Sequence, residues 1–301
     1  MAEGRKDGVL QRWWPFALVC LLASSVWLVT DSYSQVQSTL ASEAVACALA
    51  AVVSVVVAVV LKRRGGGGWG LVRPAVAGAM VLGGPASAGF LGAEGVGATS
   101  VAIALSLTPV VVAVTESVTG DEGLDAGALW PGLVAVTALL LVLAPPSFAD
   151  LRSDVALALG PLLTGVGCVM FRRSGNGVAA AWRVSAGLLG AAVVYGVVVL
   201  GEGVVRRQLP EVSLAAVGID AVLFGLGMLA LSRVTASQYV ARYAVVPLLI
   251  LLQGVLLLHS EVTVRIAACG VLLAIASVVL LRSGVKAAGN EFGGVENLPQ
   301  G

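Results

Sequence analysis

Long apolar stretches separated by short polar segments dominate the chain. Ten of these stretches approach the roughly 20 residues that an α-helix needs to cross the hydrocarbon core of a bilayer. The polar segments between them are too short to form soluble domains, so the pattern predicts one antiparallel bundle of membrane-spanning helices. The predicted spans are, with approximate ends, Trp13–Thr30, Glu43–Leu61, Pro74–Leu91, Val96–Thr115, Leu129–Pro145, Val155–Phe171, Val178–Leu200, Ser213–Leu231, Ser237–Leu258 and Val264–Leu281.

Composition supports a membrane location and argues against several kinds of partner. Hydrophobic residues make up 58% of the chain and charged residues 12%, whereas soluble domains carry about 25% charged residues. The net charge is +1 and there is one histidine, so we expect no nucleic-acid partner. The four cysteines lie inside apolar runs without a CxxC pair. We therefore expect no disulfide framework, no metal site and no cofactor.

The distribution of lysine and arginine predicts how the chain is oriented. With the N-terminus in the cytoplasm, the inside segments hold 13 of these residues and the outside segments 4, while Arg242 lies within a span. Cytoplasmic loops are enriched in positive charge. We predict a multi-pass protein of the inner membrane with both termini in the cytoplasm. The N-terminal tail (1–12) precedes the first span, and the polar, Gly-rich tail (285–301) is expected to be disordered.

The two halves of the chain share a pattern. Pro109 and Pro247 are 138 residues apart, and the same offset places Gly89 on Gly227 and LTPVVVAV on VVPLLILL. Five helices in each half is an odd number, so the second half must enter the membrane in the opposite sense. We predict two inverted five-helix repeats, residues 1–147 and 148–284. Transporters built this way bind their substrate near the bilayer midplane, where interrupted helices meet.

Three prolines are candidate interruptions of these helices. Pro109 and Pro247 each remove a hydrogen bond to the carbonyl group four residues earlier. Pro85 follows two glycines in LGGPASAGFLG. Each is a candidate hinge or kink beside a solute cavity. The alternatives are a static packing kink for Pro109 and Pro247, and close helix packing through small residues for the Pro85 segment.

The ninth predicted span carries a polar face. Tyr239, Arg242, Tyr243 and Gln253 fall on one side of a helix at their spacing. Such a face is unsuited to lipid and could bind an anionic or zwitterionic group through hydrogen bonds and charge. We take these four residues, with Thr108 beside Pro109, as candidate solute-binding residues.

Acidic residues supply candidates for coupling. Asp220 lies inside the eighth predicted span, roughly 10 Å from its outer end at 1.5 Å per residue. An intramembrane acid costs about 2.5–3.5 kcal/mol, so such acids are usually paired or functional. Arg242 is its natural partner, as a working pair or as a salt bridge that only fixes packing. Glu94 and Glu116, near span ends, are candidates for proton coupling or solvated end residues.

These features together resemble the drug/metabolite transporter superfamily, with the EamA-like family the nearest branch. The resemblance rests on ten helices in two halves and on a mid-helix proline followed by an acid, in LSLTPVVVAVTESVTGDEG and again in ARYAVVPLLILLQGVLLLHSE. The first span, ASSVWLVTDSYSQ, lacks the Trp-Gly pair often seen in that branch. The resemblance implies movement of small metabolites or drugs, often outward and commonly coupled to protons.

The sequence therefore predicts a secondary transporter and not an enzyme. It would export amino acid-like or other zwitterionic or anionic solutes, or drugs, by alternating access, as a monomer or a homodimer. The alternative is a polytopic membrane enzyme that acts on a lipid, with Asp220, Glu94 or Glu116 as its acid or base.

Overall fold

The computed structural model describes the backbone of residues 3–32, 39–61, 68–91, 96–120, 126–143, 150–174, 178–206, 212–259 and 261–293. The side chains of these residues are also described, except in 3–10, 27–32, 68–69, 126–128, 202–206 and 283–293. Within these ranges every regular element is a helix. The helices are α1 (Glu3–Ser32), α2 (Leu40–Val60), α3 (Gly68–Gly83), α4 (Ser87–Phe90), α5 (Ala98–Leu105), α6 (Thr108–Thr119), α7 (Ala126–Val142), α8 (Leu151–Arg173), α9 (Ala180–Arg206), α10 (Leu214–Arg233), α11 (Ala236–Val240), α12 (Arg242–Leu257) and α13 (Val264–Gly293).

Many of these helices are long and apolar enough to cross a membrane. Seven candidate spans are found in the described part of the chain, with α5 and α6 forming one of them and α11 and α12 another. Two further apolar helices, Gly70–Gly83 and Leu129–Val142, are shorter. The prediction of an all-α, polytopic membrane protein is confirmed at this level.

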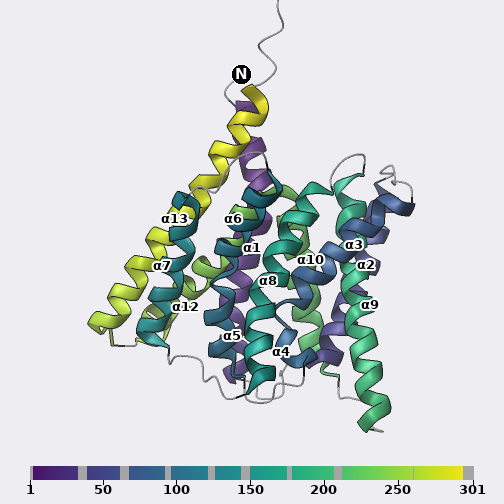
Figure 1. Ribbon diagram of the computed structural model, residues 1–301, viewed down its shortest axis with the longest axis horizontal. Coiled ribbons are helices and arrows are strands. Elements are labelled where there is room, and N and C mark those ends of the chain that lie inside the picture. Colours follow the sequence, from purple (N-terminus) through teal and green to yellow (C-terminus); the bar gives the residue numbers. More distant parts are fainter. Residues whose placement is uncertain are drawn as a thin grey trace, which may run out of the picture.

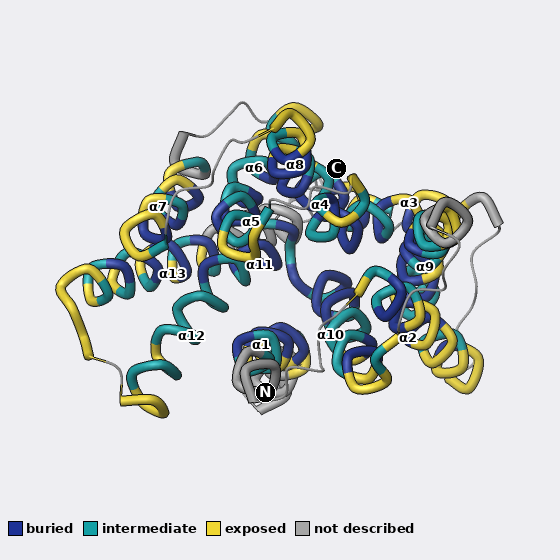
Figure 2. Tube along the Cα trace, turned by 90° about the horizontal axis from the view of Figure 1, so that it is seen from below, coloured by how far each residue is buried: buried dark blue, intermediate teal, exposed yellow. Residues whose placement is uncertain are grey.

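The helices form a bundle that is seen along its length in Figure 1 and from one end in Figure 2. Helices α2, α3 and α9 pack together on one flank, and α7, α12 and α13 lie on the other. Helix α8 connects elements from both halves of the chain, because it contacts α3, α4, α5, α6, α10 and α11. Asp150 caps the start of α8, where hydrogen bonds from Ser153 lower the pKa of the Asp150 carboxyl group.

Glycines allow the backbone of α3 to approach the backbones of α9 and α8 closely. A Cβ atom on Gly78 of α3 would overlap the backbone of Gly187 of α9, and one on Gly190 would overlap the Ala75 carbonyl group. On α8, a Cβ atom on Gly167 would come within 2.9 Å of the Ala77 carbonyl oxygen. Close approach through small residues is how helices associate in a bilayer, where apolar surface alone gives no preference for protein over lipid.

Two helix interruptions in the first half meet at a small cavity. Residues Gly84–Ala86 form a turn between α3 and α4, so Pro85 lies at an observed break. The second break separates α5 from α6, just before Pro109. The cavity lies against α8, with Gly84, Ser87, Leu105 and Gly160 among its lining residues, and its volume of about 10 Å³ has room for about one water molecule.

The prolines differ in their local structure. Pro109 leaves the Leu105 carbonyl oxygen without its helical hydrogen-bond donor. Thr108 Oγ1 replaces that donor with a hydrogen bond of 2.6 Å to the same oxygen. Pro247, in contrast, lies inside α12, and the interruption in this span is at Ala241, six residues earlier. A proline can stay within a membrane helix when its surroundings accommodate the freed carbonyl group.

Candidate functional site

The break between α11 and α12 positions Arg242 at the start of a helix. Ala241 ends α11 and precedes α12, and no side chain caps the new helix. Tyr239 precedes the break, while Arg242 and Tyr243 follow it. Ala241 itself keeps helical backbone angles (φ −55°, ψ −21°). The three side chains lie together because residues three and four apart are neighbours on a helix surface.

The guanidinium group of Arg242 is held by two aromatic rings. Its Cζ atom is 4.4 Å from the ring centroid of Tyr239 and 4.7 Å from that of Tyr243. Its Nη2 atom also donates a hydrogen bond of 2.7 Å to Tyr243 Oη. Cation–π contacts of this kind stabilise a charged group that has lost water. The arginine is thus held in one orientation.

Most donors of this guanidinium have no acceptor among the residues that the structure describes. The group has five N–H bonds, and Tyr243 Oη is its one acceptor among the described residues. The Nε atom is buried and has no acceptor there, and no described carboxylate forms an ion pair with Arg242. The hydroxyl group of Tyr239 is likewise buried without a described partner. Arg242 Nε and Tyr239 Oη are thus two buried donors of this site without a partner among the described residues.

Three other helices complete the surroundings of Arg242. Cys20 of α1 and Cys168 of α8 lie within electrostatic range of the guanidinium group, and Thr164 of α8 lies beside the Tyr243 hydroxyl group. Gly227 of α10 faces the same place, since a Cβ atom there would lie 3.3 Å from Tyr239 Oη and 3.6 Å from Arg242 Nη1. The site is built from segments that are far apart in the sequence.

Two predicted solute-binding residues lie outside this cluster. Gln253 is 11 residues beyond Arg242, or roughly 16 Å along a helix, and its Nε2 atom donates bonds of 3.1 Å to Ser24 and to Ser25 of α1. Thr108 is buried and its hydroxyl group bonds the α5 backbone. Of the five candidates, Arg242, Tyr239 and Tyr243 form one site.

Asp220 belongs to a different cluster from Arg242. The described contacts contain no ion pair between them, and the charge of Asp220 acts instead on Cys47 of α2 and Tyr195 of α9, as does that of Glu43. Asp220 and Arg242 are separated because they lie at different depths along the bundle. Gly227, which faces Arg242, lies seven residues after Asp220, roughly 10 Å along α10 at 1.5 Å per residue. The sequence placed both groups in one region but could not fix this separation.

Glu116 joins α6 to α11. Its Oε2 atom accepts a hydrogen bond of 2.9 Å from Ser237 Oγ, and the charges of Arg172 and Arg173 act on it from the last turn of α8. Arg173 Nη1 also donates to the Thr119 carbonyl oxygen at 2.6 Å. Glu94 lies outside the described residues.

Gln238 is a residue that the sequence reasoning missed. It is fully buried and forms a capping box with Thr235. Its Oε1 atom accepts a bond of 3.2 Å from Arg12 Nη2, and its Nε2 atom donates to the Leu281 carbonyl oxygen at 3.3 Å. It therefore links α1, α11 and α13 at one end of the bundle. The pattern TASQ (Thr235 to Gln238) is the capping-box signal that could have indicated it.

In the described part of the chain, no group of His, Cys, Asp or Glu residues could hold a metal ion.

No family model matches the chain, and no curated protein matches it. Seventeen chains of solved structures do match. One is a crystal structure whose name says only "protein"; it aligns over 92% of this chain and 98% of its own, with a TM-score of 0.63 and 16% identity. This similarity shows a shared fold and carries no activity with it.

Proposed function

We propose that the chain is a secondary transporter that binds a small anionic or zwitterionic solute at Arg242 and moves it across the membrane by alternating access. The observation that supports this most is the guanidinium group within the bundle, with free N–H donors and no described carboxylate partner. A buried charge is costly unless it is paired and hydrogen-bonded. An arriving carboxylate would supply the missing partner, whereas lipid would not.

The proposed architecture has ten spans in two inverted repeats. The seven long candidates, the two shorter apolar helices and α1 would make ten. The helix breaks at α3–α4, α5–α6 and α11–α12 support this proposal, because inverted-repeat transporters bind their solute where broken helices meet. The resemblance to EamA-like drug/metabolite transporters agrees with it, and export from the cytoplasm is the direction which that resemblance favours.

The orientation proposed from the positive charges assigns roles to the two ends of the bundle. Arg12, Arg172, Arg173 and Arg233 would face the cytoplasm. There the Ser237–Glu116 and Arg12–Gln238 hydrogen bonds join helices around the site. We propose that these contacts close the cytoplasmic side in the conformation described, and that they separate when the site opens inward.

Ligand binding by the purified protein tests the proposal. We expect small carboxylates or zwitterions to raise its melting temperature, while neutral sugars and cationic drugs leave it unchanged. A ligand that binds only the folded state stabilises it by about 2.7 kcal/mol at 100 times its dissociation constant. Solutes that produce a shift should also be taken up by proteoliposomes. If no anion or zwitterion shifts the melting temperature or crosses the membrane, the proposal is wrong.

We further propose that Asp220 couples transport to protons, because it is an intramembrane acid separate from the arginine site. An amide cannot exchange a proton, so Asp220→Asn is expected to keep solute binding but to lose the stimulation of flux by a pH gradient. Flux into proteoliposomes with and without an imposed gradient measures this. Asp150→Asn, at the exposed start of α8, is the matched control. Gradient-driven flux of the wild-type size in Asp220→Asn would contradict the coupling role.

A further inference from the structure

Helices α3 and α9 begin side by side on the flank that they share with α2 (Figure 2). A Cβ atom on Gly70 of α3 would lie 3.4 Å from Val178, just before α9, and one on Gly78 would overlap the backbone of Gly187. The two contacts come in the same order along both helices, so α3 and α9 run in the same direction. We call the region between these contacts, together with the end of α2, the α2–α3–α9 corner.

Two arginines lie in this corner. Arg73 follows Gly70 by three residues and Arg183 precedes Gly187 by four, within a layer roughly 12 Å deep at 1.5 Å per residue. Residues four apart share a helix face, so Arg183 lies on the side of α9 that meets α3. Arg73 is exposed, whereas Arg183 is half-buried and its Nε atom is fully buried. Neither side chain has a hydrogen bond or an ion pair among the residues that the structure describes.

The sequence of the corner supplies positive charge and no acid to balance it. Residues 61–75, from the end of α2 into α3, contain four lysines and arginines and no Asp or Glu. Residues 174–201, which include most of α9, contain Arg183 and likewise no Asp or Glu. A buried part of a guanidinium group without an acceptor is costly. The corner therefore favours an anionic partner that comes from outside the chain.

The side chains around the two arginines are those of a membrane boundary. Trp182, next to Arg183, is partly exposed, and tryptophan is enriched at the level of lipid headgroups. Farther along the same helices the exposed side chains are apolar, with Val76 on α3 and Leu189 and Val193 on α9. A lipid whose headgroup met the arginines would thus have apolar surface beside its acyl chains.

We infer that the α2–α3–α9 corner binds the headgroup phosphate of an anionic phospholipid, with Arg183 and Arg73 as its ligands. A phosphodiester carries one negative charge and two free oxygens, which match the paired donors of a guanidinium group. Basic residues beside membrane helices attract anionic lipids. The inference is independent of the proposed transport, and it holds whichever side of the membrane this end of the bundle faces.

Lipid binding by the purified protein, measured by native mass spectrometry, tests the inference. Phosphatidylglycerol and phosphatidylcholine with the same acyl chains share the phosphodiester and differ in net charge. We expect the wild type to prefer phosphatidylglycerol, and Arg183→Gln to reduce this preference about fivefold. The reason is that one basic residue at an anionic membrane surface contributes about 1 kcal/mol.

Arg282→Gln is the matched control, because it removes an exposed arginine from α13, on the opposite flank of the bundle. This variant should keep the preference of the wild type. Equal affinities of the wild type for the two lipids would overturn the inference. So would a preference of wild-type size in Arg183→Gln, or a loss in Arg282→Gln as large as in Arg183→Gln.

Inorganic phosphate distinguishes a lipid from a soluble ligand. It offers similar oxygens without acyl chains, so it should leave the melting temperature of the wild type unchanged, whereas phosphatidylglycerol raises it. Equal stabilisation by the two would overturn the assignment to a lipid. If Arg183→Gln does not fold, Arg73→Gln provides the test, since Arg73 is exposed in the same layer. That variant should also lose part of the preference for phosphatidylglycerol, and an unchanged preference would overturn the inference.

Discussion

Replacing Arg242 with methionine is expected to abolish solute binding and transport, while the protein without solute remains folded and at least as stable as the wild type. Methionine keeps much of the volume and removes a buried charge that has no described carboxylate partner. Apolar replacements of buried charged groups are often neutral or stabilising. Removing one partner of a buried charge pair costs a complex about 2–5 kcal/mol, or roughly thirty- to several-thousand-fold in affinity.

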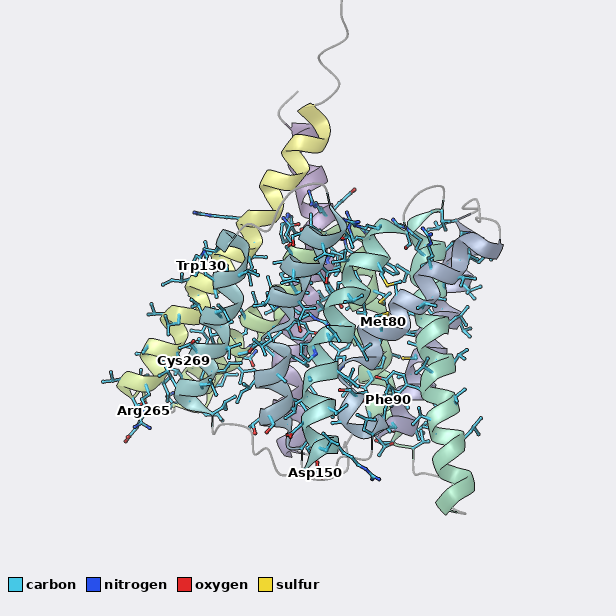
Figure 3. All side chains as sticks on the ribbon, in the orientation of Figure 1. Met80, Phe90, Trp130, Asp150, Arg265 and Cys269 are labelled. Carbon is cyan, nitrogen blue, oxygen red and sulfur yellow. The ribbon has the colours of Figure 1, made fainter. Side chains whose placement is uncertain are left out.

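The measurements are the solute-induced shift in melting temperature and the rate of uptake by proteoliposomes. Arg265→Met is the matched control, because it makes the same substitution at an exposed arginine. Arg265 lies at one end of the bundle, the end that also holds Asp150 (Figure 3), and its variant should behave as the wild type. A large fall in the melting temperature of Arg242→Met without solute would instead identify the arginine as a packing residue. Wild-type flux in that variant would remove it from the binding site.

Replacing Gly190 with alanine is expected to destabilise the protein strongly. Gly190 packs directly on the backbone of α3, and the added methyl group would overlap the Ala75 carbonyl group. A backbone carbonyl cannot move aside as a flexible side chain can, so α3 and α9 must separate. Overpacking costs about 1–3 kcal/mol, and occasionally more. We therefore expect a lower yield of monodisperse protein and a markedly lower melting temperature.

Gly196→Ala is the control for this substitution on the same helix. No atom lies within 4 Å of the Cβ position of Gly196, and alanine favours a helix over glycine by roughly 0.5–1 kcal/mol. This variant should be as stable as the wild type or slightly more so. Similar melting temperatures for the two alanine variants would show that α3 and α9 do not approach as closely as described.

The sequence by itself was enough to predict an all-α, polytopic membrane protein and the approximate positions of its helices. Apolar runs of span length predict membrane helices because lipid selects apolar side chains at every depth. Local spacing also grouped Tyr239, Arg242 and Tyr243, since residues three and four apart share a helix face. The breaks at Pro85 and before Pro109 were signalled by glycine and proline in the same way.

Only the tertiary structure decided which groups meet across helices. The depth and rotation of one helix against another separate Asp220 from Arg242 and place Gln253 against Ser24 and Ser25. They also place Gly227, which has no side chain to signal a role, against the arginine. These relations depend on packing between segments far apart in the chain. A local pattern fixes the face on which a residue lies, but the partner of that face is set by the whole bundle.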